Sequence, residues 1–350
     1  MRAGRRAVKA GKPGGPGRVD RAMATPASLA QQLRAARDGA AVGRLAPLDV
    51  LRLSGPEHRE ALDRIVSQDV KRMPAGHGRL ALLLAPKGQF RALMAVCTGV
   101  DELLLLAPPG RGEQLASGLA NYLRFSKCTL APAVTGGTGL VVIGPRWTEV
   151  VEAAGADAAT LAAGGACRVG NGAAATIWFG WTFLGVPGAI AVTGAAALAG
   201  LEVALVGADA VAVGAEALEL VRIAAGFPAW GAELTDTVLP PEVGIDTAAI
   251  SYGKGCYVGQ ETIARMKTYG HPNRQLVRVL QVDGPDPLPD LPLPLTATGE
   301  EKPRATLTSF GRDPERGGIG LALARREIAD PGVRLSGAGL TFQIVPSLLE

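Results

Sequence analysis

Hydrophobic and polar positions along the first part of the chain follow two different spacings. Residues 49–70 hold an apolar run, a Ser-Gly-Pro turn and then apolar residues at helical spacing, which predicts a strand followed by a helix. Residues 79–97 and 101–108 hold three extended apolar runs separated by short polar turns, which predicts an antiparallel meander. Helical spacing returns at residues 110–125. Strands and helices alternate without a regular strand–helix–strand repeat, so the pattern predicts an α+β core.

The middle of the chain continues this mixture. Residues 139–144 form an apolar run that predicts a strand, and residues 145–156 have helical spacing behind a proline. Residues 176–194 predict further strands, and residues 214–226 predict a helix closed by its last glycine. The α+β organisation therefore extends to the region around residue 226.

The pattern changes near residue 275. A proline-rich stretch, residues 283–295, predicts a connection without regular structure. Closely spaced short strands follow around residues 304–311, 318–324 and 333–339, as in a small barrel or sandwich. We therefore expect a core domain at residues 23–275 and a β-barrel domain at residues 276–350.

The charge of the chain is unevenly distributed. The net charge is +4, but residues 1–22 alone contain seven basic residues and one acidic residue, which leaves the rest at about −2. The body of the protein therefore has no general basic character, and a nucleic-acid-binding surface is not expected. The glycine- and proline-rich segment 1–22 is predicted to be a disordered basic tail.

Other features of the sequence limit the chemistry. The apolar region 189–214 is interrupted by Glu202 and Asp209, so it predicts buried strands and a packed helix, not a membrane span. No dinucleotide loop, P-loop, HExxH or GxSxG pattern occurs, and the three histidines stand alone. The four cysteines contain no CxxC pair, which predicts a reducing, cytoplasmic compartment and no metal site. These cysteines are Cys97, Cys128, Cys167 and Cys256.

Residues 254–261, KGCYVGQE, concentrate reactive side chains in a chain otherwise poor in them. A helix is predicted to begin near Gly259, so Cys256 would precede a helix N-terminus with Lys254 close by. Both features favour a thiolate. The alternative is a small cysteine that fills a gap beside glycines. The candidate reactive residues are Lys254, Cys256, Tyr257, Gln260 and Glu261.

The run KGCYVGQETIARM resembles the C-terminal signature of the YgfZ-type folate-binding proteins, which are relatives of the glycine cleavage T protein. This resemblance implies a folate-binding α+β core of two interlocked subdomains with a small C-terminal β-barrel. The eight-residue motif is highly specific, and flanking similarity extends over most of the chain. The flanking segments are residues 51–70, 83–92, 222–245 and 321–335.

The resemblance also implies a function. Such proteins bind tetrahydrofolate and support iron–sulfur enzymes, including a radical enzyme that thiomethylates tRNA, and the cysteine of their motif corresponds to Cys256. The expected partners are therefore iron–sulfur enzymes or assembly proteins, with only an indirect link to tRNA. The predicted folate-binding residues are Arg222, Phe227 and Trp230, which bracket the helix end before the motif, together with Arg265.

Two other functions remain open. An aminomethyltransferase of the T-protein type would need acids to bind the pterin and the amine, but Ala92, Leu93 and Ala224 occupy the positions where those acids would fall. Each unpaired N–H group left in a pocket would cost about 1–3 kcal/mol, which argues against that activity. A non-catalytic folate-binding scaffold is the other alternative. It would tolerate the substitution Cys256→Ala, whereas a thiol-dependent mechanism would not.

Overall fold

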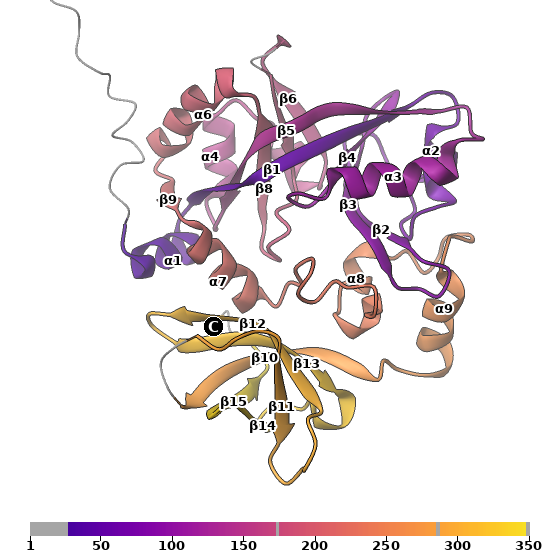
Figure 1. Cartoon of the computed structure of the whole chain (residues 1–350). Helices are drawn as coiled ribbons and strands as arrows, with labels where there is room; N and C mark the ends of the chain where they lie inside the picture. The colour runs from indigo at the N-terminus through magenta and orange to yellow at the C-terminus, as the bar shows by residue number, and fades with distance from the viewer. Residues whose placement is uncertain (1–26, 173–174, 285–287, 348–350) are drawn as a thin grey trace, which may run out of the picture.

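A computed structural model describes residues 27–172, 175–284 and 288–347, and they form a mixed core followed by a barrel (Figure 1). The predicted α+β class with a C-terminal β-barrel is confirmed. The core elements extend to α9 (Gln260–Tyr269), and the barrel begins with β10 (Arg274–Asp283). The predicted basic tail, residues 1–22, lies outside the described residues.

One sheet runs through the core in the order β2-β3-β4-β1-β5-β8-β7-β6, and β9 adds to β1 as a parallel neighbour. The other strand pairs of this sheet are antiparallel, and β2, β3 and β4 form the predicted meander. The strands are β1 (Ala41–Ser54), β2 (Gly78–Leu84), β3 (Phe90–Thr98), β4 (Glu102–Leu106), β5 (Thr129–Ile143), β6 (Ala166–Val169), β7 (Thr176–Phe179), β8 (Gly188–Thr193) and β9 (Val211–Val213).

Two long strands interlock the halves of the core. β1 has 14 residues and β5 has 15, compared with about 5–6 in an ordinary strand. One end of this pair continues to β4, and the other end continues to β8. Their register shifts between Leu45 and Leu51, around Pro47, so a bulged segment joins the two halves. Both predicted strands were too short, because prolines and glycines hide the alternation in their first halves.

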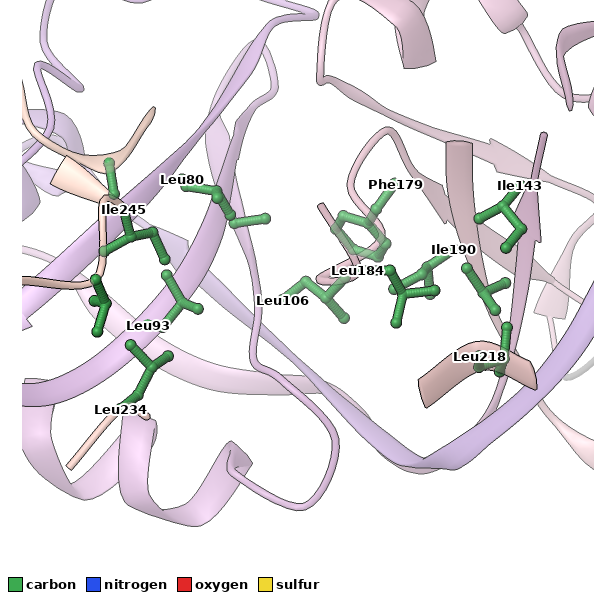
Figure 2. Packing of buried hydrophobic residues seen from close by; sticks show 14 of the residues in the cluster. Leu80, Leu93, Leu106, Ile143, Phe179, Leu184, Ile190, Leu218, Leu234 and Ile245 are labelled. Atoms are coloured by element: carbon green, nitrogen blue, oxygen red, sulfur yellow. The ribbon is translucent and has the colours of Figure 1, made fainter. Parts of the chain in front are cut away.

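Helices cover the two halves on separate faces. α2 (His58–Asp63) and α3 (Gly112–Leu123) pack on β2–β4, whereas α4 (Trp147–Ala153), α5 (Ala158–Ala162) and α6 (Ala195–Gly207) pack on β5, β7 and β8. The apolar region 189–214 is β8, α6 and β9, as predicted. A third apolar cluster joins the inner faces of both halves. Figure 2 shows Leu80, Leu93, Leu234 and Ile245 on one side of it, and Phe179, Leu184 and Ile190 on the other.

The inner face also holds α1 (Leu29–Asp38), α7 (Ala215–Ala225) and α8 (Asp246–Ala249), and the end of α7 joins the barrel. α7 is closed by Gly226, which has a φ of 73°, as the sequence predicted. Arg278 of β10 donates hydrogen bonds to the carbonyls of Ala224 (3.2 Å) and Ala225 (2.6 Å). A Cβ at Gly226 would lie 2.5 Å from the Arg278 guanidinium, so the contact requires glycine.

The barrel closes in the order β10-β13-β12-β11-β14-β15. Its other strands are β11 (Leu293–Ala297), β12 (Ala305–Asp313), β13 (Gly317–Arg325), β14 (Arg334–Gly337) and β15 (Leu340–Val345). The prediction of an irregular connection over residues 283–295 was wrong at its end, where β11 begins. Pro294 is tolerated because residues 293–295 pair with β12 alone, and β14 pairs with the following residues, 296–297. Among the described residues, no helix is long and apolar enough to cross a membrane.

Candidate functional site

The KGCYVGQE motif forms the loop that leads into α9, and it presses against the turn between β2 and β3. α9 begins at Gln260, as predicted. The preceding residue, Gly259, has a φ of 81°, and a Cβ there would lie 2.4 Å from the carbonyl oxygen of Ala85. Only glycine combines this backbone conformation with so close an approach. The motif is therefore seated on the β2–β3 turn by its own backbone.

Lys254 fastens the other end of the motif. Its buried ammonium donates to the carbonyl oxygens of Asp63 (2.5 Å), Val66 (2.9 Å) and Gln68 (2.8 Å), at and beyond the end of α2. The Asp63 carboxylate lies 3.4 Å away. Burial lowers the pKa of Lys254, and the charge of Asp63 opposes this effect. Lys254 was predicted to favour the thiolate form of Cys256. In the structure, its ammonium donates its hydrogen bonds to backbone carbonyls.

The next residues alternate between the interior and the surface. Cys256 is exposed, and Tyr257 is buried in the inner apolar cluster. The Tyr257 ring lies 5.6 Å from the Lys254 ammonium, and burial raises the pKa of Tyr257 to about 12. Two buried anchors thus hold a loop that presents one thiol to solvent.

The other three cysteines have different surroundings. Burial raises the pKa of Cys97, whose thiol donates to the carbonyl of Gly164 (3.3 Å). Burial also raises the pKa of Cys128 and Cys167, which are half-buried. All four cysteines are free. Within the described ranges, no group of three His, Cys, Asp or Glu side chains could hold a metal ion.

The remaining predicted residues of the motif lie on α9. Gln260 is half-buried at the first position of the helix. Glu261 follows in the first turn, where a carboxylate stabilises the helix N-terminus, and its side chain is exposed. Arg265 is exposed as well and lies 3.9 Å from Glu261. This pair is too solvated to contribute more than a few tenths of a kcal/mol.

Three of the four predicted folate-binding residues line one cavity. Arg222, Phe227 and Trp230 surround a space of about 220 Å³, which we call the Trp230 cavity. Leu93 of β3 and Leu234 contribute its aliphatic wall, and both are visible in Figure 2. Arg265 does not line this cavity. The sequence thus located three residues of one cavity, and the fourth lies on α9 with the motif.

Arg222 does not offer a free donor to this cavity. Its five N–H groups are directed to the carboxylate of Glu219, the carboxylate of Glu233, the Phe227 carbonyl and the Ser309 hydroxyl. Burial lowers the pKa of Arg222, but the hydrogen bonds and charges of Glu219 and Glu233 outweigh burial and raise it overall. Ser309 belongs to β12, so this buried network fastens α7 to the barrel. Arg222 contributes a wall of the cavity and no open hydrogen-bonding group.

Sequence reasoning missed Arg111, which also lines the Trp230 cavity. Its guanidinium carbon lies 5.5 Å from the centre of the Trp230 ring. Across the described part of the chain, its guanidinium makes one hydrogen bond, a long one of 3.5 Å to the Gln114 side chain. Arg111 directly precedes α3, more than a hundred positions before Trp230. The sequence alone offers no signal for this contact.

The positions that lack the T-protein acids do not face a single cavity. Ala92 packs in the outer cluster beneath α2 and α3, whereas the neighbouring Leu93 lines the Trp230 cavity. Ala224 lines a second cavity of about 490 Å³ between α1, α7 and the barrel. Of the three substitutions, Leu93 therefore bears directly on the chemistry of the Trp230 cavity.

Comparisons with known proteins agree with this architecture. Residues 18–252 match the family described as the GCVT N-terminal domain. The chain is 29% identical over 226 residues to the tRNA-modifying protein YgfZ of Cronobacter sakazakii (strain ATCC BAA-894), covering 64% of this chain and 66% of that protein. It is 31% identical over 138 residues to an aminomethyltransferase of Geobacillus kaustophilus (strain HTA426), covering 38% of this chain and 36% of that protein. The matched segments thus span less than two thirds of both relatives.

A solved structure extends the fold comparison to nearly the whole chain. The glycine cleavage system aminomethyltransferase T from Bartonella henselae superimposes with a TM-score of 0.78 at 16% identity. The superposition covers 92% of this chain and 89% of that one. At this identity the similarity establishes the shared fold.

Proposed function

The chain belongs to the family of the GCVT N-terminal domain, and from this premise we propose that it binds a reduced folate in the Trp230 cavity and supports iron–sulfur enzymes through Cys256. The resemblance to YgfZ-type proteins is confirmed by the match to a YgfZ sequence. That relative is named for tRNA modification, and in this proposal the link to tRNA is indirect, through an iron–sulfur enzyme that modifies it.

The observation that carries the proposal is the presentation of one thiol. Cys256 is exposed between the buried anchors Lys254 and Tyr257, while burial raises the pKa of the other three cysteines. An accessible thiol on a well-anchored loop suits contact with a protein partner. The partner in this proposal is an iron–sulfur enzyme or an assembly protein.

The Trp230 cavity supports the folate part of the proposal. Its walls combine aromatic Phe183, Phe227 and Trp230 with aliphatic Leu93 and Leu234, a lining that fits the faces of a bicyclic reduced pterin. When bound, a reduced folate would supply one-carbon chemistry. The residues named here would hold its ring.

Aminomethyl transfer is a weaker proposal for this chain. Leu93 lines the cavity where a carboxylate would have to pair with the pterin and the amine, and it offers no acceptor. Leaving such N–H groups unpaired costs about 1–3 kcal/mol each. We therefore expect the protein not to restore growth on glycine as nitrogen source in cells that lack their T protein.

The test combines binding with complementation. Calorimetric titration with tetrahydrofolate should give the same affinity for wild type and Cys256→Ala, and at least a tenfold weaker affinity for Trp230→Ala, since base–aromatic contacts contribute about 1–3 kcal/mol. In a deletion strain, Cys256→Ala should fail to restore iron–sulfur enzyme activity, while the control Cys167→Ala should restore it. Full rescue by Cys256→Ala would instead support the non-catalytic scaffold.

A further inference from the structure

We propose that the protein partner of Cys256 docks with an acidic segment in a groove beside α3, which we call the α3 groove. Its contact surface extends over the β2–β3 turn to the bare backbone of Gly253 and Gly255. This inference rests on the proposed function, because the partner is the iron–sulfur enzyme or assembly protein that the thiol serves. It adds where that partner binds and which charge it carries.

Two glycines beside Cys256 are not required by the fold of the described residues. Gly253 and Gly255 are exposed, and neither has a φ in the left-handed region. A Cβ built on either would have no atom within 4 Å beyond its chain neighbours. Gly259 differs, because its φ and the Ala85 carbonyl exclude a side chain. Glycines in open space leave the backbone accessible to close approach by another molecule.

The α3 groove adjoins the turn that receives the motif. It has a volume of about 370 Å³, and it combines apolar residues of the β2–β3 hairpin with polar side chains of α3. The lining residues include Ala85, Arg91, Gln114, Ser117, Asn121 and Tyr122. The four residues from α3 have helical spacing, so they form one stripe along the groove.

The groove and the thiol are close enough for one partner to cover both. Ala85 lines the groove, and its carbonyl is the group against which Gly259 is seated. Cys256 lies three residues before Gly259, and three residues of extended chain span at most about 11 Å. Figure 1 shows the β2–β3 hairpin between α3 and α9. A standard interface covers about 800 Å² of each partner, which is wide enough to include both features.

Basic side chains without an ionic partner flank the α3 groove. Arg91 lines it, Lys87 lies on the turn, and Arg124 directly follows α3. All three are exposed, and none of them forms a salt bridge across the described residues. The described residues that line the groove include no acid. An acidic protein segment is therefore complementary to this surface.

Aromatic side chains at the same end of α3 favour a protein partner. Tyr122 is 43% exposed and Phe125 is 85% exposed, and the Arg124 guanidinium carbon lies 4.5 Å from the centre of the Phe125 ring. Aromatic residues and arginine are enriched in protein–protein interfaces. An RNA fits less well, because its phosphates need a longer row of cations and the residues after 22 carry a net charge of about −2.

The first test reverses a charge in the groove. In a deletion strain, Arg91→Glu should restore about tenfold less iron–sulfur enzyme activity than wild type, because like charges would then face each other. Arg168→Glu is the matched control, since Arg168 is exposed on β6, at the opposite end of the sheet from β2. It should restore activity as wild type does. Both variants should bind tetrahydrofolate with unchanged affinity.

The second test places a side chain on the bare backbone. Gly255→Leu should keep the urea midpoint of wild type, because nothing in the described chain contacts that position, and should lose iron–sulfur enzyme activity. Gly200→Leu is the control, because Gly200 on α6 is equally exposed and has no atom near its Cβ position. It should retain activity. Full activity of both Arg91→Glu and Gly255→Leu would overturn the inference.

The third test identifies what occupies the groove. Ser117 replaced by the photo-crosslinking residue p-benzoylphenylalanine should crosslink to an iron–sulfur enzyme or assembly protein, within a segment of net negative charge that mass spectrometry identifies. The same residue at position 200 should not. A crosslink to a basic segment, to RNA, to a second copy of this chain or to no molecule would refute the acidic partner. If wild type itself restores no iron–sulfur enzyme activity, the proposed function falls, and this inference falls with it.

Discussion

Replacing Lys254 with methionine should lower the free energy of unfolding by about 3 kcal/mol and leave the thiol of Cys256 reactive. The side chain of Lys254 is only 1% exposed, and its ammonium donates to three backbone carbonyls that lie more than 180 positions earlier in the chain. Methionine keeps most of the apolar stem and removes the charge.

The expected loss of stability combines two destabilising effects and one stabilising effect. Hydrogen bonds to a charged group contribute about 1.5–3 kcal/mol each, and a stranded buried carbonyl costs about 1–3 kcal/mol. Asp63 and Gln68 are half-buried, so water can replace the ammonium at their carbonyls, but Val66 is buried. Removing a buried charge recovers part of its desolvation cost. The stranded Val66 carbonyl and the lost charged bonds outweigh this recovery.

Urea unfolding followed by tryptophan fluorescence measures the stability, and alkylation of Cys256 at fixed pH measures the reactivity. Lys87→Met is the matched control, because Lys87 is exposed on the turn that supports the motif, and its substitution should change stability by less than about 0.5 kcal/mol. If Lys254→Met kept full stability and slowed the alkylation of Cys256, Lys254 would activate the thiol and not anchor the loop.

Three further predictions concern Gly259 and the cysteines. Gly259→Ala should destabilise the protein by about 2–4 kcal/mol, since alanine would adopt a left-handed conformation against the Ala85 carbonyl, and a lower urea midpoint would reveal it. In the native protein, iodoacetamide should label Cys256 before the other cysteines, as peptide mass spectrometry can establish, and equal labelling of all four would contradict the structure. Burial raises the pKa of Cys97, so above about pH 8.5 the unfolded thiol ionises while the folded one stays neutral, and stability falls by up to about 1.4 kcal/mol per pH unit. Cys97→Val should remove this contribution. The free energy of unfolding, measured at several pH values, would contradict it if it fell equally with pH in both proteins.

The fold was predictable where the spacing of apolar residues is regular. The meander β2–β4, the helix α7 with its closing Gly226 and the start of α9 follow directly from the sequence. The long strands β1 and β5 were only partly predicted, because tertiary pairing keeps them extended through prolines and glycines that locally favour turns. The same holds for β11, where pairing on one side allows Pro294.

The candidate site was predictable only to the extent that it is local in sequence. The motif lies within eight consecutive residues, so its cysteine, its glycine and the following helix could be identified together. The partners of Lys254 and the contact between Arg111 and Trp230 join segments more than a hundred positions apart. No local pattern specifies such contacts, so the sequence predicted Lys254 near Cys256 but not its three carbonyl partners.

The Trp230 cavity and the Cys256 loop share one support, the β2–β3 hairpin. Leu93 of β3 lines the cavity, and the turn that precedes β3 receives Gly259 of the motif. Tyr257 packs in the same inner apolar cluster as Leu93. A substitution that disturbs this cluster would therefore damage folate binding and thiol presentation together. Cys256→Ala removes only an exposed sulfur, so a loss of iron–sulfur enzyme activity with unchanged folate affinity would assign the defect to the thiol and not to the hairpin.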